Sequence, residues 1–165
     1  LHGGDSYVWN WVRAPDRLLM VYTHYERTGR AFEKNMFDLV ALDLESAQVV
    51  YQHRDGQSPD YSPDGRWVAF RSGSAVVVVN AASGTVYRQL LFKTSVAPSL
   101  SPDNELVVAA TDWGCEVWSL QTGNRLAVLN VGTLDLVPTF SPDGKWLLTV
   151  AGGVVTLWGV PTVQT

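Results

Sequence analysis

The chain has 165 residues, of which 46 % are hydrophobic and 17 % are charged, a composition that can build a packed core and excludes a disordered chain. Twelve Lys and Arg against sixteen Asp and Glu leave a net charge of −4. We therefore expect neither a nucleic-acid partner nor a membrane partner, because phosphate binding depends on clustered positive charge and no apolar run approaches the roughly 18 residues of a membrane helix. The single cysteine excludes an internal disulfide and a cysteine-rich metal site.

A four-residue turn sequence recurs along the chain. Its copies are Ala14-Pro15-Asp16-Arg17, which is the weakest, Ser62-Pro63-Asp64-Gly65, Ser101-Pro102-Asp103-Asn104 and Ser141-Pro142-Asp143-Gly144. The aspartates of successive copies are 48, 39 and 40 residues apart. Pro presets φ, Asp accepts hydrogen bonds within its own turn and Gly tolerates positive φ, so each copy predicts a tight turn.

Short β-rich runs, separated by further turns, follow every copy. In chain order we expect strands at residues 18–22, 37–42 and 48–52, then 67–70, 75–79 and 85–91, then 106–110, 115–118 and 125–129, and last 146–150 and 154–158. With one strand before each turn, a repeat becomes a four-stranded antiparallel meander, which is the unit of a β-propeller. The sequence predicts an all-β chain with four consecutive blades, the last one incomplete, at about 7–53, 57–91, 95–129 and 134–160.

These repeats resemble the WD-repeat β-propeller family. The fourth repeat carries the resemblance over residues 139–148 and in Val155-Thr156-Leu157-Trp158, and the second, over residues 61–70, also resembles propellers of periplasmic translocation proteins and of prolyl-oligopeptidase-type peptidases. The Trp-Asp dipeptide of the family is replaced by Leu42-Asp43, Val79-Asn80, Trp118-Ser119 and Trp158-Gly159. The resemblance implies the fold and a platform for assembling complexes, but the family's Trp-Asp hydrogen-bond network cannot be transferred to this chain.

Four blades of this kind are expected to form part of a larger ring, residues 1–165 being a partial propeller. Two apolar blade faces would otherwise be open, and monomers do not leave such faces exposed. Three arrangements remain open: a segment of a longer polypeptide, a homodimer that completes an eight-bladed ring, or a chain that packs on another protein or closes by itself. Arg13 stands where later repeats have Tyr61, Leu100 or Phe140. Either the repeat has diverged and Arg13 reaches the rim, or blade 1 faces something other than an ordinary blade.

One connection in the first repeat, His24 to Asn35, is much longer than its counterparts. Long loops in compact domains are often functional, and aromatic and Arg side chains are enriched in interface hot spots. The candidate partner-binding residues are Tyr25, Arg27, Arg30, Phe32 and Lys34. The alternative is a solvated β-hairpin extension without a specific role.

We expect no catalytic, cofactor-binding or metal-binding residues. The chain has no Gly-x-Ser-x-Gly elbow, no metal-ligand spacing and no phosphate-binding loop. Asp64, Asp103 and Asp143 are interpreted as turn caps, and the tryptophans at 67, 118, 146 and 158 as blade packing. The predicted function is a non-catalytic protein-interaction scaffold. The alternative is the substrate-gating propeller of a prolyl-oligopeptidase-like serine peptidase whose catalytic domain lies outside this chain.

Overall fold

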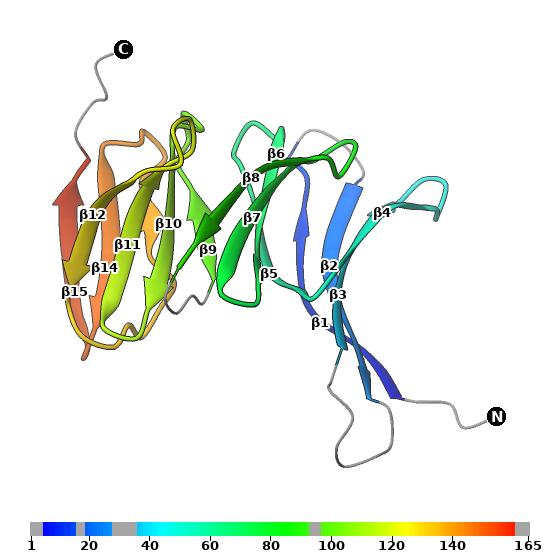
Figure 1. Cartoon of the computed structure of the whole chain (residues 1–165), viewed down its shortest axis with the longest axis horizontal. Helices are drawn as coiled ribbons and strands as arrows, with labels where there is room; N and C mark the ends of the chain where they lie inside the picture. Colours follow the sequence, from blue (N-terminus) through cyan, green and yellow to red (C-terminus); the bar gives the residue numbers. More distant parts are fainter. Residues whose placement is uncertain (1–4, 16–18, 28–35, 93–96, 161–165) are drawn as a thin grey trace.

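The structure is a computed structural model that describes residues 5–15, 19–27, 36–92 and 97–160. In these residues, 15 strands form four separate antiparallel sheets, three with four strands and one with three, each in simple meander order (Figure 1). The predicted all-β architecture of consecutive blades, with a short last blade, is confirmed. No helix in this part of the chain is long and apolar enough to cross a membrane.

The sheets are numbered as blades in chain order. Blade 1 holds β1 (Asp5–Arg13), β2 (Leu19–Arg27), β3 (Met36–Asp43) and β4 (Val49–Arg54). Blade 2 holds β5 (Gly56–Tyr61), β6 (Trp67–Ser72), β7 (Ala75–Asn80) and β8 (Val86–Leu91). Blade 3 holds β9 (Pro98–Leu100), β10 (Leu106–Thr111), β11 (Gly114–Ser119) and β12 (Arg125–Asn130). Blade 4 holds β13 (Thr139–Phe140), β14 (Trp146–Ala151) and β15 (Val154–Gly159).

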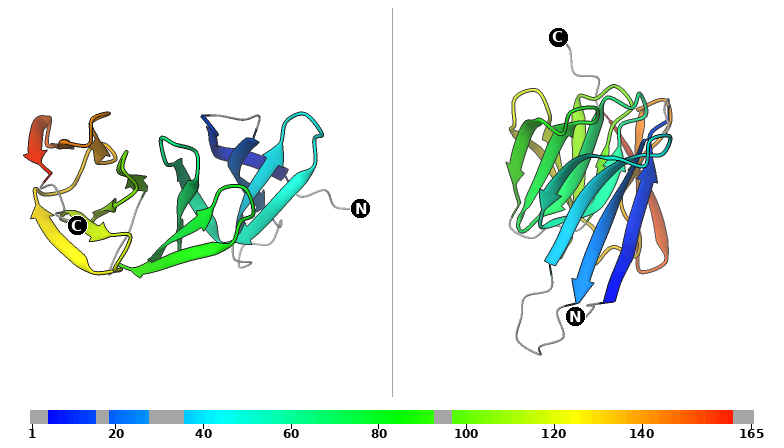
Figure 2. Two further views of the ribbon diagram at one scale, coloured as in Figure 1. Left: turned by 90° about the horizontal axis from the view of Figure 1, so that it is seen from above. Right: turned by 90° about the vertical axis from the view of Figure 1, so that its right-hand side faces the viewer.

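The four blades stand side by side along an open arc, which is clearest when the molecule is seen from above (Figure 2). The first strands of neighbouring blades contact each other, β1 with β5, β5 with β9 and β9 with β13. The last strands β8 and β12 lie on the outer side of the arc (Figure 2). The arc does not close, so the face of blade 1 that points away from blade 2 and the face of blade 4 that points away from blade 3 have no neighbouring blade among the described residues.

Three apolar cores hold the arc together, one at each boundary between consecutive blades. Strand β7 shows why its sequence is a run of valines: side chains alternate between the two faces of a strand. Val77 and Val79 belong to the core shared with blade 1, whereas Val76 and Val78 belong to the core shared with blade 3. Because both faces are buried, every position of β7 except the last is apolar.

The second strand of blade 1 differs from its prediction. The sequence predicts that this strand ends at residue 22, but β2 continues to Arg27 and pairs with β3 up to Glu26↔Met36 and with β1 up to Asp5↔Arg27. The long connection is therefore partly a three-stranded extension of the sheet. Alternation of apolar and polar residues fades beyond Tyr22, which is why the extension was not visible in the sequence.

A pair of adjacent leucines tests the role of the boundary cores. Leu90 is 2 % exposed in the core between blades 2 and 3, and Leu91, next to it on β8, is 69 % exposed. We expect Leu90→Ala to lower the free energy of unfolding by about 2–5 kcal/mol, since truncation of a buried Leu loses transfer energy and leaves a cavity. Leu91→Ala is the matched control and should change it by less than about 0.5 kcal/mol. Denaturant unfolding measures both, and equal effects would contradict the assignment of the core.

Candidate functional surfaces

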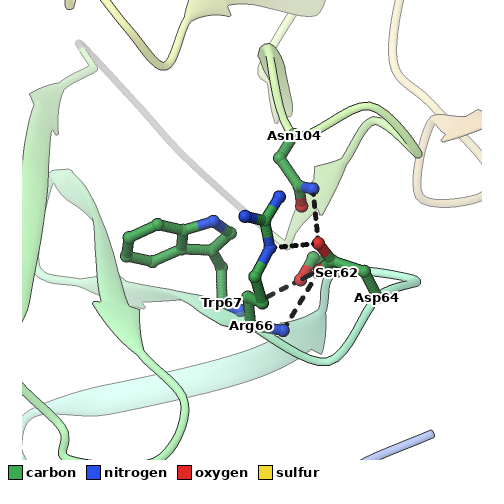
Figure 3. Close-up of polar contacts among 5 residues, drawn as sticks. All are labelled: Ser62, Asp64, Arg66, Trp67 and Asn104. Atoms are coloured by element: carbon green, nitrogen blue, oxygen red, sulfur yellow. Dashed lines mark hydrogen bonds and ion pairs between the residues drawn. The ribbon is translucent and has the colours of Figure 1, made fainter.

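The repeated turns form the most regular polar feature of the molecule (Figure 3). In blade 2, Ser62 Oγ donates a hydrogen bond to Asp64 Oδ1 at 2.7 Å, and the backbone N–H of Arg66 donates to the same oxygen at 3.1 Å. The backbone N–H of Trp67 donates to Ser62 Oγ at 3.0 Å. The Arg66 guanidinium also pairs with Asp64. The turn thereby fixes the start of β6 relative to the end of β5.

The same geometry occurs in blades 3 and 4. The Ser-to-Asp bonds measure 2.5 Å for Ser101–Asp103 and 2.6 Å for Ser141–Asp143. Across the boundary, Asn104 Nδ2 of blade 3 donates to Asp64 Oδ2 of blade 2 at 2.8 Å (Figure 3). The interpretation of these aspartates as turn caps is confirmed, and one of them also joins two blades.

Hydrogen bonding determines the titration of these carboxyl groups. Partial burial alone would raise the pKa of Asp64, but hydrogen bonds from Ser62, Arg66 and Asn104 outweigh it and lower the pKa to about 2. Hydrogen bonds from the Ser141 hydroxyl and the Lys145 backbone lower the pKa of Asp143. Both side chains are thus held as carboxylates, and their oxygen atoms already accept hydrogen bonds from residues of their own turns.

A second cap lies at the position that holds Asp in a Trp-Asp dipeptide. In blade 1, Asp43 Oδ1 accepts hydrogen bonds from the Glu45 and Ser46 backbones at 3.1 and 2.7 Å. Asn80 Oδ1 accepts from the Ala82 and Ser83 backbones at 3.0 and 3.1 Å. The dipeptide is lost, but its second residue still closes the turn between the third and fourth strands of a blade.

Asp60 is a partly buried carboxyl group whose role the sequence did not reveal. It lies on β5, and its Oδ2 accepts a hydrogen bond from the Leu100 backbone N–H of blade 3 at 3.1 Å. Burial raises its pKa to about 6, although the hydrogen bonds from Leu100, Ser99 and Tyr61 oppose the rise. Only the packing of blade 3 against blade 2 creates this environment, so no local sequence signal could have identified it.

The raised pKa predicts how stability depends on pH. Because the folded-state pKa of about 6 lies above the ordinary value of 3.8, the contribution of Asp60 is fully present below about pH 4 and is lost as the pH rises through 6. Asp60→Asn keeps an acceptor for the Leu100 N–H without the charge. We expect Asp60→Asn to raise the free energy of unfolding at pH 8 by about 1–3 kcal/mol. The variant should also reduce the dependence of this free energy on pH between pH 4 and 7.

Asp143→Asn is a control of opposite sign for that experiment. Its pKa is lowered, so its contribution is present above about pH 4 and is lost on acidification. Asp143→Asn should therefore lower the melting temperature at pH 7 and not at pH 3. A loss of stability at pH 8 in Asp60→Asn, measured by thermal unfolding over a pH series, would contradict the raised pKa.

The outer face of blade 4 is apolar and exposed. Its cross-strand pairs include Leu148↔Leu157 and Val150↔Val155, and Val155 and Leu157 are 61 % and 58 % exposed. The equivalent pairs of blade 2, Ala69↔Val78 and Arg71↔Val76, face blade 3 instead. The interpretation of Trp146 as packed within the blades is wrong for the described structure: it is 48 % exposed, whereas its counterpart Trp67 packs on the core between blades 2 and 3.

The outer face of blade 1 is apolar except for the charged side chain of Arg13. Trp11 and Arg13 alternate with Val12, which packs against the core shared with blade 2, so both side chains lie on the opposite face. Trp11 is 60 % exposed, and Arg13 is exposed as well. Trp11 therefore does not lie in a core between blades within the described residues.

The predicted partner-binding residues fall in two places. Tyr25 and Arg27 lie in the extended part of β2, where the structure describes the backbone. Arg30, Phe32 and Lys34 lie outside the described residues. The structure places the first two on a projecting sheet extension and leaves the five-residue set as a prediction.

A pocket of about 230 Å³ lies between blades 3 and 4 and is lined almost entirely by apolar side chains, among them Ala127, Leu129 and Trp158. At the matching place in blade 2, Arg88 reaches blade 3 and donates to the carbonyl oxygens of Leu120 and Gln121 at 3.1 and 2.6 Å. Ala127 is too short to do the same, so the pocket results from a smaller side chain. Within the described ranges no three His, Cys, Asp or Glu residues gather in a way that could hold a metal ion.

Comparison with known proteins identifies the fold and the repeats. No family model matches the chain. In an alignment of 125 residues that covers 70 % of this chain, it is 29 % identical to an uncharacterized WD repeat-containing protein of Synechocystis sp.. The structure also matches the β-propeller domain of Cps50 (Swd1) from Myceliophteria thermophila with a TM-score of 0.71 over 96 % of this chain, at 12 % identity. The four blades therefore have the fold of a β-propeller domain, and their sequence is similar to that of a WD repeat-containing protein.

The module is smaller than the proteins it matches. The aligned residues span 36 % of the Synechocystis protein, and the chain covers 52 % of the solved propeller. A chain that corresponds to about half of a solved propeller agrees with the open arc and with the apolar outer faces of blades 1 and 4.

Proposed function

We propose that this chain is a non-catalytic protein-interaction scaffold module and forms four blades, at about residues 7–53, 57–91, 95–129 and 134–160, of a larger propeller. The outer face of blade 4 carries the proposal, since position by position it matches the face that blade 2 buries against blade 3. Exposed apolar surface of this extent marks an interaction site. The face is suited to another blade because its cross-strand pairs have the same register as the pairs at the boundary between blades 2 and 3.

The extension of blade 1 is the proposed contact for a separate protein partner. Strands β1, β2 and β3 all continue beyond the lengths seen in blade 2, so the extension stands clear of the packed arc (Figure 1). Its sequence supplies two aromatic and three basic side chains, Tyr25, Arg27, Arg30, Phe32 and Lys34. Such side chains dominate binding energy where an interface excludes water.

Residues 25–37 can be removed without changing strand register, because His24 pairs with Asp38. Closing this pair with an Asp-Gly turn should leave the melting temperature within a few degrees and abolish capture of a partner that the parent polypeptide retains. The control is Leu44→Ser, an exposed residue in the turn at the opposite end of blade 1. Affinity capture with mass spectrometry reads the result. Equal capture by the shortened and parent proteins would contradict the role of the extension.

Residues 1–165 expressed alone should associate at micromolar concentration, because the outer faces of blades 1 and 4 are then uncovered. Val155→Glu with Leu157→Glu places two carboxylates on the outer face of blade 4 and should shift the population towards monomer. The control is Val86→Glu with Val128→Glu, on outer strands where both residues are also exposed. Sedimentation velocity measures the distribution. A monomeric parent would contradict the proposal that this face requires a cover.

A further inference from the structure

Arg13 occupies a position that the other blades use for packing. In blades 2, 3 and 4 the corresponding residues are Tyr61, Leu100 and Phe140, and each packs into the core shared with the preceding blade. Arg13 occupies the same place by register, since Arg13 pairs with Met20 as Tyr61 pairs with Val68. It therefore points to whatever precedes blade 1 in the ring.

The rest of this face is shaped for an ordinary blade. Its apolar residues match, one for one, the residues that blade 2 buries against blade 1. In pairs, these are Met20 and Val68, Tyr22 and Phe70, Val40 and Val77, and Leu42 and Val79. A neighbouring sheet that covers these apolar positions must also cover the position of Arg13.

A covered guanidinium needs a negative partner. Arg13 is exposed, and its guanidinium group makes no hydrogen bond or ion pair with any other residue that the structure describes. Arginine stays charged in proteins, and an unpaired buried charge costs several kcal/mol, whereas a carboxylate that accepts both guanidinium N–H bonds offsets much of this. Arg88, on the outer strand of blade 2, uses two backbone carbonyl oxygens of blade 3 instead. On the innermost strand, where a neighbour would cover the whole side chain, a carboxylate is the partner that also neutralises the charge, and we expect the cover of blade 1 to present one.

Asp60 indicates where such a carboxylate can come from. It lies on the first strand of blade 2, and its Oδ2 reaches the Leu100 backbone of blade 3, which is the residue equivalent to Arg13. In blade 4 the residue in the position of Asp60 is Thr139, since Thr139 pairs with Leu148 as Asp60 pairs with Ala69. A second copy of this chain would bring a hydroxyl group, not a carboxylate, to this point.

We propose that the outer face of blade 1 is covered by the last blade of the same ring, supplied by another part of the same polypeptide, and that an Asp or Glu on its innermost strand pairs with Arg13. This inference rests on the proposed membership of a larger propeller and names the neighbour. The coverage agrees with it, because the chain accounts for 52 % of a solved propeller and its aligned part for 36 % of its WD-repeat relative. The ion pair fixes which blade may close on blade 1, since an apolar or basic neighbour would leave Arg13 unpaired.

The pairing is tested in the complete polypeptide that contains this chain. Arg13→Leu copies the residue of blade 3 and should lower the melting temperature at pH 7 by roughly 5 °C or more, because the facing carboxylate is left buried and unpaired. Arg13→Lys should recover part of the loss. Arg54→Leu, another exposed arginine on blade 1, is the control and should change the melting temperature by less than about 2 °C. Arg13→Leu that is as stable as the parent, or more stable, overturns the ion pair.

A photoreactive benzoylphenylalanine in place of Trp11 identifies the neighbour directly. The expected product is an intramolecular crosslink to a peptide outside residues 1–165 that contains an Asp or Glu. A crosslink to residues 139–159 of another copy, or to a different protein, overturns the proposal. The scaffold function is tested separately, by affinity capture with the variant whose blade 1 extension is shortened. A failure of the crosslinking experiment does not change the capture result, so failure of the ion pair and failure of the scaffold function can be distinguished.

Discussion

Every sheet in this molecule depends on the burial of both of its faces. A blade is one sheet thick, so it has no interior of its own, and its apolar side chains leave water only when another blade packs on each side. Burying a side chain such as valine or leucine contributes about 1.5–3 kcal/mol. Val76 and Val77, adjacent on β7, belong to different cores and stabilise different boundaries. Stability therefore grows with the number of neighbours, as in other repeat folds.

The polar turns operate at short range and serve this packing. Each Ser–Asp pair satisfies backbone N–H groups where the first strand of a blade turns into the second, and this fixes the register that sorts side chains onto the two faces. Asn104 and Asp60 add two polar links across one boundary, that between blades 2 and 3. The two links have opposite pH behaviour, because hydrogen bonds from Ser62, Arg66 and Asn104 lower the pKa of Asp64 whereas burial raises the pKa of Asp60.

The open ends of the arc follow from the same constraint. Blades 2 and 3 have a neighbour on both sides, and blades 1 and 4 have one each. Trp11, Trp146 and Leu157 are exposed on these two faces, and in the proposed larger ring they would pack against further blades. A buried arginine in one such face would be a specificity element, since it accepts an acidic neighbour and rejects an apolar one. In the proposed closed ring, the last blade would cover the apolar face of blade 1 and would also supply the acidic partner of Arg13.

Much of the fold was determined by the sequence alone. The Ser-Pro-Asp period and the alternation of apolar residues predicted four meanders, the short last blade and the turn-capping aspartates, because turn chemistry and strand periodicity are local properties. Tertiary structure decided the rest. Trp67 and Trp146 hold the same place in their repeats, yet one is packed and the other is half exposed, because only blade 2 has a neighbour on that side. The raised pKa of Asp60 likewise arises when blade 3 removes it from water, an effect that no local pattern can show.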